Sequence, residues 1–118
     1  MKEIKKMAAT IYHALDEKKG EQILILDVSQ IFSFADYFVI TNGSGSTQIQ
    51  ALVDEVEEKM HKAGFSLKSK EGRNMSTWML LDYGDVIVHI FDRESREYYH
   101  LERIWSDAKA VDPEEILS

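Results

Sequence analysis

The sequence predicts an α/β domain built on a mixed β-sheet, with helices packed on at least one of its faces. Three observations support this fold class. Two segments repeat apolar residues at helical spacing, two short aliphatic runs between them have the composition of buried strands, and a β-hairpin pattern follows the second helix. The length of 118 residues suits a single domain covering 1–118, with a core large enough to fold without disulfides.

The first predicted helix covers about residues 2–19, because apolar side chains recur there every three or four positions and Gly20 follows as a stop signal. Segments 22–28 and 36–41 are short and aliphatic, which is typical of strands buried on both faces. The chain is therefore expected to begin with one helix and two strands of the same sheet.

A glycine-rich turn at 42–46 leads into the second predicted helix, which starts near Thr47 behind a capping Ser46 and ends at Gly64. A turn of this kind can bind a phosphate at the start of the helix. Gln48, however, stands where a dinucleotide-binding fingerprint has its third glycine, and the lysine of a P-loop is missing. We therefore interpret the segment as a tight structural turn.

Beyond the second helix, residues 65–70 are expected to form a short edge strand, and the hairpin follows. Asp92 or Ser95 is expected to cap a last helix. Residues 106–118, in which Pro113 interrupts any helix, are expected to be a loosely ordered tail.

The hairpin covers 78–91, and its second strand turns Val86, Val88 and Ile90 toward the core. A two-residue turn at Tyr83-Gly84 would gather three cross-strand pairs on the other face: Asp82 with Asp85, Leu80 with Ile87, and Trp78 with His89. A three-residue loop with a left-handed Gly84 would instead place Trp78 and Leu80 with the valines. The sequence leaves the register open, and the first version is favoured because it keeps the Asp82 carboxylate out of the core.

Four side chains in this region could in principle hold a divalent metal ion: Asp82, Asp85, His89 and Asp92. Their spacing argues against it, because Asp82 and Asp85 flank the turn while His89 lies several residues away at ~3.3 Å per residue. The chain has no cysteine, which excludes thiolate chemistry, and it has no serine nucleophile elbow. We therefore expect neither a metal nor another cofactor.

The charge balance is acidic, with 14 Lys and Arg against 21 Asp and Glu and a formal net charge of −7. Such a balance argues against tight direct binding to nucleic acid, while it is compatible with a basic protein partner or simply with solubility. The N-terminal segment is amphipathic, and no long apolar run occurs. A cytoplasmic protein without a membrane-spanning segment is therefore expected.

Large apolar and aromatic side chains gather on the non-valine face of the hairpin and in the segment that follows it. They are Trp78, Leu80, Ile87, Phe91, Tyr98, Tyr99 and Trp105. They can either pack against the last helix as core or form a protein interface. Composition alone favours core packing.

Several sequence blocks between Ile4 and Trp105 carry a resemblance to a known family. They are Leu26-Asp27-Val28, the run from Ser33 to Gly43, Glu71-Gly72, the run from Trp78 to His89, and the run from Tyr99 to Trp105. Through these blocks the chain resembles the ribosomal silencing factor family, also called RsfS or Iojap-like. The resemblance implies a nucleotidyltransferase-like α/β fold without demonstrated catalysis, so the chain is expected not to be an enzyme.

The resemblance also implies a partner and a role. Proteins of this family bind the large ribosomal subunit through ribosomal protein uL-fourteen, block joining of the small subunit sterically, and so repress translation when nutrients are scarce. Carried onto this chain, the implied contact residues are Trp78, Leu80, Asp82, His89, Tyr99 and Leu101. An exposed apolar surface of this kind could also form a homodimer in the free protein.

The alternative function is a metal-dependent nucleotidyl or phosphoryl transferase that uses Gly43, Ser44 and the aspartates. Enzymes of that kind hold their metals with aspartates one residue apart on a strand. Asp82 and Asp85 are instead separated by two residues. This departure favours the regulator over the enzyme.

Overall fold

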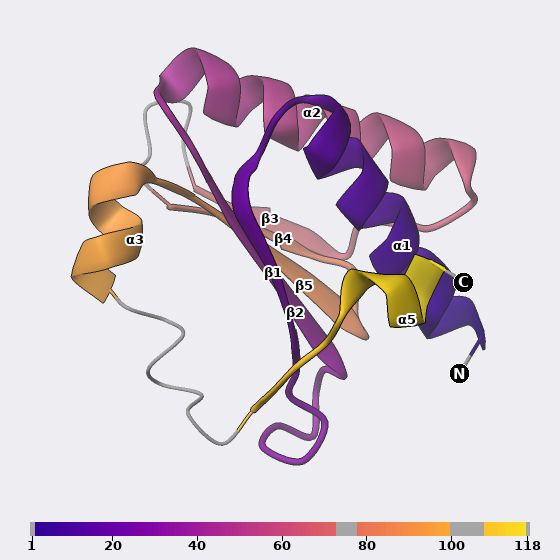
Figure 1. Cartoon of the computed structure of the whole chain (residues 1–118). Helices are drawn as coiled ribbons and strands as arrows, with labels where there is room; N and C mark the ends of the chain where they lie inside the picture. Colours follow the sequence, from indigo (N-terminus) through magenta and orange to yellow (C-terminus); the bar gives the residue numbers. More distant parts are fainter. Residues whose placement is uncertain (1, 73–77, 100–107, 118) are drawn as a thin grey trace.

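The computed structural model describes residues 2–72, 78–99 and 108–117, and these residues form one mixed six-stranded sheet with helices (Figure 1). The elements are α1 (Lys2–Glu17), β1 (Glu21–Asp27), β2 (Tyr37–Gly43), α2 (Ser46–Lys62), β3 (Ser69–Glu71), β4 (Trp78–Asp82), β5 (Val86–Asp92), α3 (Arg93–Tyr99), β6 (Lys109–Ala110) and α5 (Pro113–Leu117). The strand order is β3-β4-β5-β2-β1-β6, with β2 and β5 parallel and the other neighbours antiparallel. The predicted α/β class with a mixed sheet is confirmed, while the nucleotidyltransferase-like label stays a prediction.

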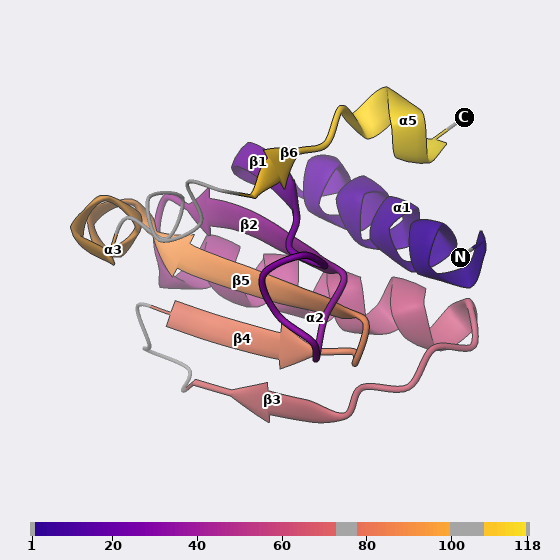
Figure 2. The same cartoon turned by 90° about the horizontal axis from the view of Figure 1, so that it is seen from below.

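Helices α1 and α2 cover one face of the sheet, which we call the helical face (Figure 2). Each helix turns an apolar stripe inward, so that Ile11 and Leu15 of α1 and Leu52 of α2 are fully buried. Across the layer they meet aliphatic side chains of the central strands, including Val39 and Val88. Branched side chains therefore seal this face from water.

Helix α1 ends with a Schellman motif, in which Gly20 N donates to Leu15 O and Lys19 N donates to Asp16 O. The left-handed residue is Lys19, with φ 62°, and not the glycine that the sequence suggested. Gly20 is required for a different reason: a Cβ there would lie 2.9 Å from Thr41 Oγ1. The glycine thus permits close approach of α1 to β2.

Helix α2 ends at Lys62, and Gly64, the predicted stop signal, follows it with φ +89°. Gly64 N donates to His61 O and Phe65 N donates to Met60 O, the two hydrogen bonds of another Schellman motif. The edge strand that follows is shorter and later than the predicted 65–70, because β3 pairs with β4 only from Ser69 to Glu71.

The hairpin turn differs from the prediction by one residue. Tyr83 N donates to Val86 O, so the two turn residues are Gly84, with φ +91°, and Asp85. Glycine with positive φ at the first turn position is typical of a type II′ turn, whereas a turn at Tyr83-Gly84 would have required that conformation of a tyrosine. The predicted partners are therefore wrong by two residues, and the observed pairs are Trp78 with Phe91, Leu80 with His89, and Asp82 with Ile87.

A shift of two residues leaves the faces of a strand unchanged. Trp78, Leu80 and Asp82 accordingly lie on the face of His89, as the favoured version predicted, while Met79 and Leu81 join the helical face. The three-residue loop is excluded.

The C-terminal segment corrects another prediction, because residues 108–117 are packed and not a loose tail. β6 pairs with β1, and Ile116 of α5 is buried in the same core as α1. Pro113 does not merely end a helix but occupies the first turn of α5, where Asp112 Oδ1 accepts a hydrogen bond from Glu114 N. No helix among residues 2–72, 78–99 and 108–117 is long and apolar enough to cross a membrane.

Candidate partner-binding surface

The face of the sheet opposite to α1 and α2 is lined by rings and large apolar side chains. A second buried cluster lies there, consisting of Leu26, Val28, Ala35, Phe38, Ile40, Ile87 and Phe91, with Phe32, Trp78 and Leu80 packed against it. We call the surface formed by Phe38, Trp78, Leu80, Asp82, His89 and Phe91 the aromatic face. Trp78, Leu80 and Asp82 are only half-buried, so this face presents large side chains to its surroundings.

The rings of the aromatic face contact one another across three strands. Trp78 lies 4.9 Å from Phe91 and 5.9 Å from His89, measured between ring centroids. His89 lies 4.8 Å from Phe38. Ring pairs of this kind prefer particular relative orientations, so they fix the positions of the rings as well as burying apolar area.

His89 is the polar centre of this ring cluster. Trp78 Nε1 donates a hydrogen bond of 3.2 Å to His89 Nδ1, so the imidazole accepts at Nδ1 and is neutral. Burial lowers the pKa of His89 to about 4, because the cation would lose its hydration among apolar rings. His89 is therefore an uncharged part of the buried ring cluster at neutral pH.

Asp82 is the acidic residue at the edge of the aromatic face. Its Oδ1 accepts a hydrogen bond of 2.7 Å from Gly84 N, which fixes the carboxylate beside the turn. A hollow of about 260 Å³ lies along the same strand edge and is lined by Glu71, Gly72, Trp78 and Leu80. The half-buried apolar surface thus has a carboxylate at the Asp82 end of β4 and a recess beside Trp78 and Leu80.

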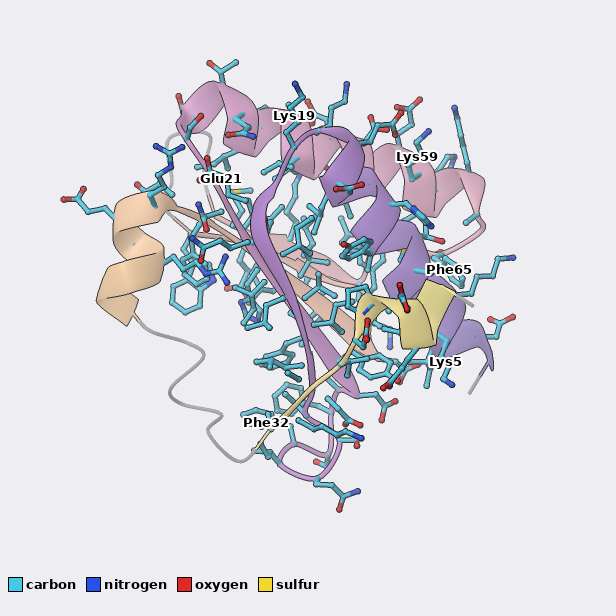
Figure 3. All side chains as sticks on the ribbon, in the orientation of Figure 1. Lys5, Lys19, Glu21, Phe32, Lys59 and Phe65 are labelled. Carbon is cyan, nitrogen blue, oxygen red and sulfur yellow. The ribbon has the colours of Figure 1, made fainter. Side chains whose placement is uncertain are left out.

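Helix α3 is held at one end of the sheet by charged side chains from its first turn. Arg93 donates from Nε to Glu21 Oε1 at 2.7 Å and also binds Glu21 Oε2 through its second guanidinium nitrogen. Arg96 donates to Gln22 O at 2.7 Å and to Asn42 Oδ1 at 2.9 Å. Figure 3 shows Glu21 between the start of β1 and α3. The hydrogen bonds with Arg93 keep the pKa of the Glu21 carboxyl below its usual value.

The predicted contact residues fall into two groups. The structure brings Trp78, Leu80, Asp82 and His89 together on one face. Tyr99 is the last residue of α3, and its side chain lies outside the described residues, as does Leu101. The role of all six in partner binding stays a prediction.

Sequence reasoning missed three further rings of the same surface, Phe32, Phe34 and Phe38. Phe32 stacks on Phe38 at 5.5 Å and lies 4.9 Å from Phe34. The alternation along β2 could have assigned Phe38 to the face of Ile40, but nothing local places the loop residues Phe32 and Phe34 there.

The glycine-rich turn is closed by hydrogen bonds within the chain. Gln48 Oε1 accepts from Ser44 N at 2.6 Å and from Ser44 Oγ at 2.9 Å, while Gln48 Nε2 donates to Lys19 O at 2.8 Å. The predicted cap at Ser46 is wrong, because α2 begins at Ser46 and the N-cap is Gly45, which makes no side-chain cap bond. The Gln48 amide thus occupies the N–H group of Ser44 that a phosphate would need.

Two of the carboxylates that the sequence offers as possible metal ligands accept hydrogen bonds from nearby backbone N–H groups instead. Asp82 binds Gly84 N, and Asp92 Oδ1 accepts from Ser95 N at 2.7 Å, which caps α3 as predicted for Asp92. Over 2–72, 78–99 and 108–117, no group of three or more His, Asp or Glu side chains is arranged to hold a metal ion. Asp82 and Asp92 therefore stabilise the backbone of the hairpin turn and of the first turn of α3.

Comparison with known proteins then identifies the family. A family model described as "Ribosomal silencing factor during starvation" matches residues 1–118. The chain belongs to the ribosomal silencing factor family. Relatives named "Ribosomal silencing factor RsfS" include one from Bacillus subtilis, 41% identical over 94% of this chain and 92% of its own length. Another, from Halalkalibacterium halodurans, is 39% identical over 90% of this chain and 91% of its own length.

Solved structures support the same assignment. A crystal structure of a protein from Chromobacterium violaceum matches with a TM-score of 0.85 and 32% identity, covering 87% of this chain and 86% of that one. One from Bacillus halodurans matches with a TM-score of 0.81 and 34% identity, covering 91% and 97%. The ribosomal silencing factors are not a known enzyme family.

The role of Gln48 predicts a stability difference along one helix. Gln48→Ala should lower the free energy of unfolding by about 1–3 kcal/mol, because it removes the partner of Ser44 N and of the Lys19 carbonyl. Gln50→Ala is the matched control, since the Gln50 amide donates to the exposed Asp54 carboxylate of the same helix and does not join two elements of the fold. Urea unfolding of both variants tests this. Equal losses of unfolding free energy would contradict the role of Gln48 in joining the turn to the end of α1.

The environment of His89 predicts a dependence of stability on pH. The unfolded His89 has a pKa near 6.5 and the folded one about 4, so between these values the unfolded state binds more protons. Stability should therefore be complete above pH 6.5 and fall by about 3 kcal/mol as the pH drops to 4.

Urea unfolding at a series of pH values measures this loss. His89→Gln should remove this part of the pH dependence, whatever it does to stability at pH 7. His13→Gln, at an exposed position of α1, should leave the wild-type slope unchanged. An unaltered slope in His89→Gln would mean that other groups cause the acid sensitivity.

Proposed function

We propose that this chain is a translational repressor that binds the large ribosomal subunit through ribosomal protein uL-fourteen and sterically blocks joining of the small subunit. Membership of the ribosomal silencing factor family supports association with the ribosome. A mouse relative, 29% identical over 78% of this chain and 42% of its own length, is named "Mitochondrial assembly of ribosomal large subunit protein 1". That name supports the large subunit as the site of binding.

The aromatic face is the observation that carries the proposal. Trp78 and Leu80 are half-buried side chains on the sheet face opposite to the one on which α1, α2 and α5 pack. Trp and large apolar side chains beside a carboxylate are typical of the residues that contribute most of the binding energy at protein interfaces. The rigid sheet would present these groups without a large loss of conformational entropy on binding.

Charge supports a basic protein as the partner. The net charge of −7 would steer the chain toward a basic ribosomal protein and away from rRNA phosphates. Asp82, held beside the turn by Gly84 N, would receive a Lys or Arg of that partner. Repression needs no chemistry in this mechanism, because an occupied surface is enough to keep the small subunit away.

Cosedimentation tests the proposal directly. The chain should sediment with isolated large subunits, and added small subunits should compete with it for joining. Light scattering would then report fewer joined ribosomes as the concentration of the chain rises. Sedimentation with small subunits only, or joining at an unchanged rate, would overturn the proposal, as would nucleotide turnover in the presence of Mg²⁺.

Trp78→Ala should weaken binding to large subunits by about tenfold or more, because it removes a ring from the centre of the proposed interface. Phe65→Ala is the matched control: Phe65 is also a half-buried ring, but it packs on the helical face. Both variants should lose stability, and only Trp78→Ala should lose affinity. A Trp78→Ala chain that fails to fold would show that Trp78 is core, and Leu80→Ser would then test the same face.

Asp82→Asn should weaken binding severalfold and make it less sensitive to salt. The amide keeps an oxygen that can accept from Gly84 N, so the variant removes the charge while the turn is retained. Asp54→Asn on α2 is the control, because Asp54 likewise accepts one hydrogen bond, from Gln50 Nε2 at 2.8 Å. Affinities measured at two salt concentrations check this, and equal behaviour of the two variants would exclude Asp82 from the contact.

A further inference from the structure

The loop between β1 and β2 carries the two large apolar side chains that are exposed in the described part of the chain. Phe34 exposes 59% of its surface and Ile31 exposes 39%. A phenylalanine that remains so accessible gains little by folding, so its ring is available for contact with another molecule.

The loop is held rigidly by hydrogen bonds at its base. Val28 N donates to Asp36 O at 2.9 Å, and Phe32 N donates to Val28 O at 2.9 Å. Asp27 Oδ1 accepts from Ser29 N at 3.0 Å and from Ser29 Oγ at 2.6 Å. A ring presented by an ordered loop costs less entropy to immobilise on binding than one on a flexible segment.

Phe34 is connected to the aromatic face through a series of ring contacts. It lies 4.9 Å from Phe32, which stacks on Phe38 at 5.5 Å, and Phe38 lies 4.8 Å from His89, the hydrogen-bond partner of Trp78. In Figure 3, Phe32 lies at the end of the sheet opposite to Glu21. The exposed ring therefore extends the aromatic face beyond the strands at that end.

The loop itself is acidic, although Lys109 of β6 pairs with Asp27 at the end of β1. The segment from Asp27 to Tyr37 contains two carboxylates, Asp27 and Asp36, and neither Lys nor Arg. Both charges, after burial itself, raise the pKa of Tyr37. The loop is therefore suited to a cationic protein surface and unsuited to a nucleic-acid backbone.

We propose that Phe34 is a second anchor of the partner-binding surface, inserting its ring into an apolar recess that is rimmed by Lys or Arg on the partner protein. The inference rests on the proposed function and adds to it what the partner must supply. Trp78 and Phe34 would then grip the partner at two positions along one continuous surface.

Binding of the full chain to large ribosomal subunits tests this inference with five variants. Phe34→Ala should bind about tenfold more weakly or worse, Phe34→Tyr within about threefold of wild type, and the neighbouring Ser33→Ala like wild type. Phe34→Lys should bind severalfold more weakly than Phe34→Glu at low salt, and the difference should shrink at high salt, because the proposed rim is basic. Thermal melting should show all of them folded, since Phe34 is exposed.

The outcomes separate this inference from the proposed function. If wild type binds large subunits and Trp78→Ala weakens binding while Phe34→Ala does not, the second anchor is wrong and the proposed function stands. If wild type does not bind, both fall together. Equal affinities of Phe34→Lys and Phe34→Glu would overturn the basic rim. A Phe34→Ala variant that loses only self-association, measured by sedimentation velocity, would make a second copy of the chain the occupant and overturn the inference.

Discussion

The turn at Gly84 fixes the register of β4 against β5, and the arrangement of both sheet faces depends on it. With φ +91°, Gly84 fits the first position of a two-residue turn that other residues would adopt only with strain. A slip of one residue would turn Trp78 and Leu80 toward α1 and α2 and bring the Asp82 carboxylate into an aliphatic core. One glycine thus decides which side chains of β4 can meet a partner.

The two faces of this sheet are sealed by different means, and the difference explains where binding can occur. On the helical face, mainly aliphatic side chains pack beneath two long helices. On the other face, rings pack against rings, with neutral His89 as the polar link between Phe38 and Trp78. Rings have few rotamers and a large surface, so they can be half-buried in the free chain and still gain contact area in a complex.

Periodicity was sufficient to predict helices α1 and α2, the central strands and the faces of the hairpin, because each depends on local alternation of apolar and polar residues. It could not locate the turn residue with positive φ, so the register was wrong by two positions although the faces were right. Lys19 in a left-handed conformation and the docking of Ile116 on α1 depend on tertiary contacts. The same holds for Phe34, whose placement follows from its contact with Phe32 and from the stacking of Phe32 on Phe38 of β2.

A glycine-rich turn before a helix is a feature that nucleotide-binding proteins use for phosphate, and here its inward hydrogen bonding argues for a structural role. Gln48 binds Ser44 on one side and the end of α1 on the other, so the turn joins two layers of the fold. A ligand that displaced the Gln48 amide would have to replace both sets of hydrogen bonds. The hydrogen bonds of this turn therefore make the fold more rigid. This rigidity supports the interpretation of the aromatic face as a preorganised surface for a protein.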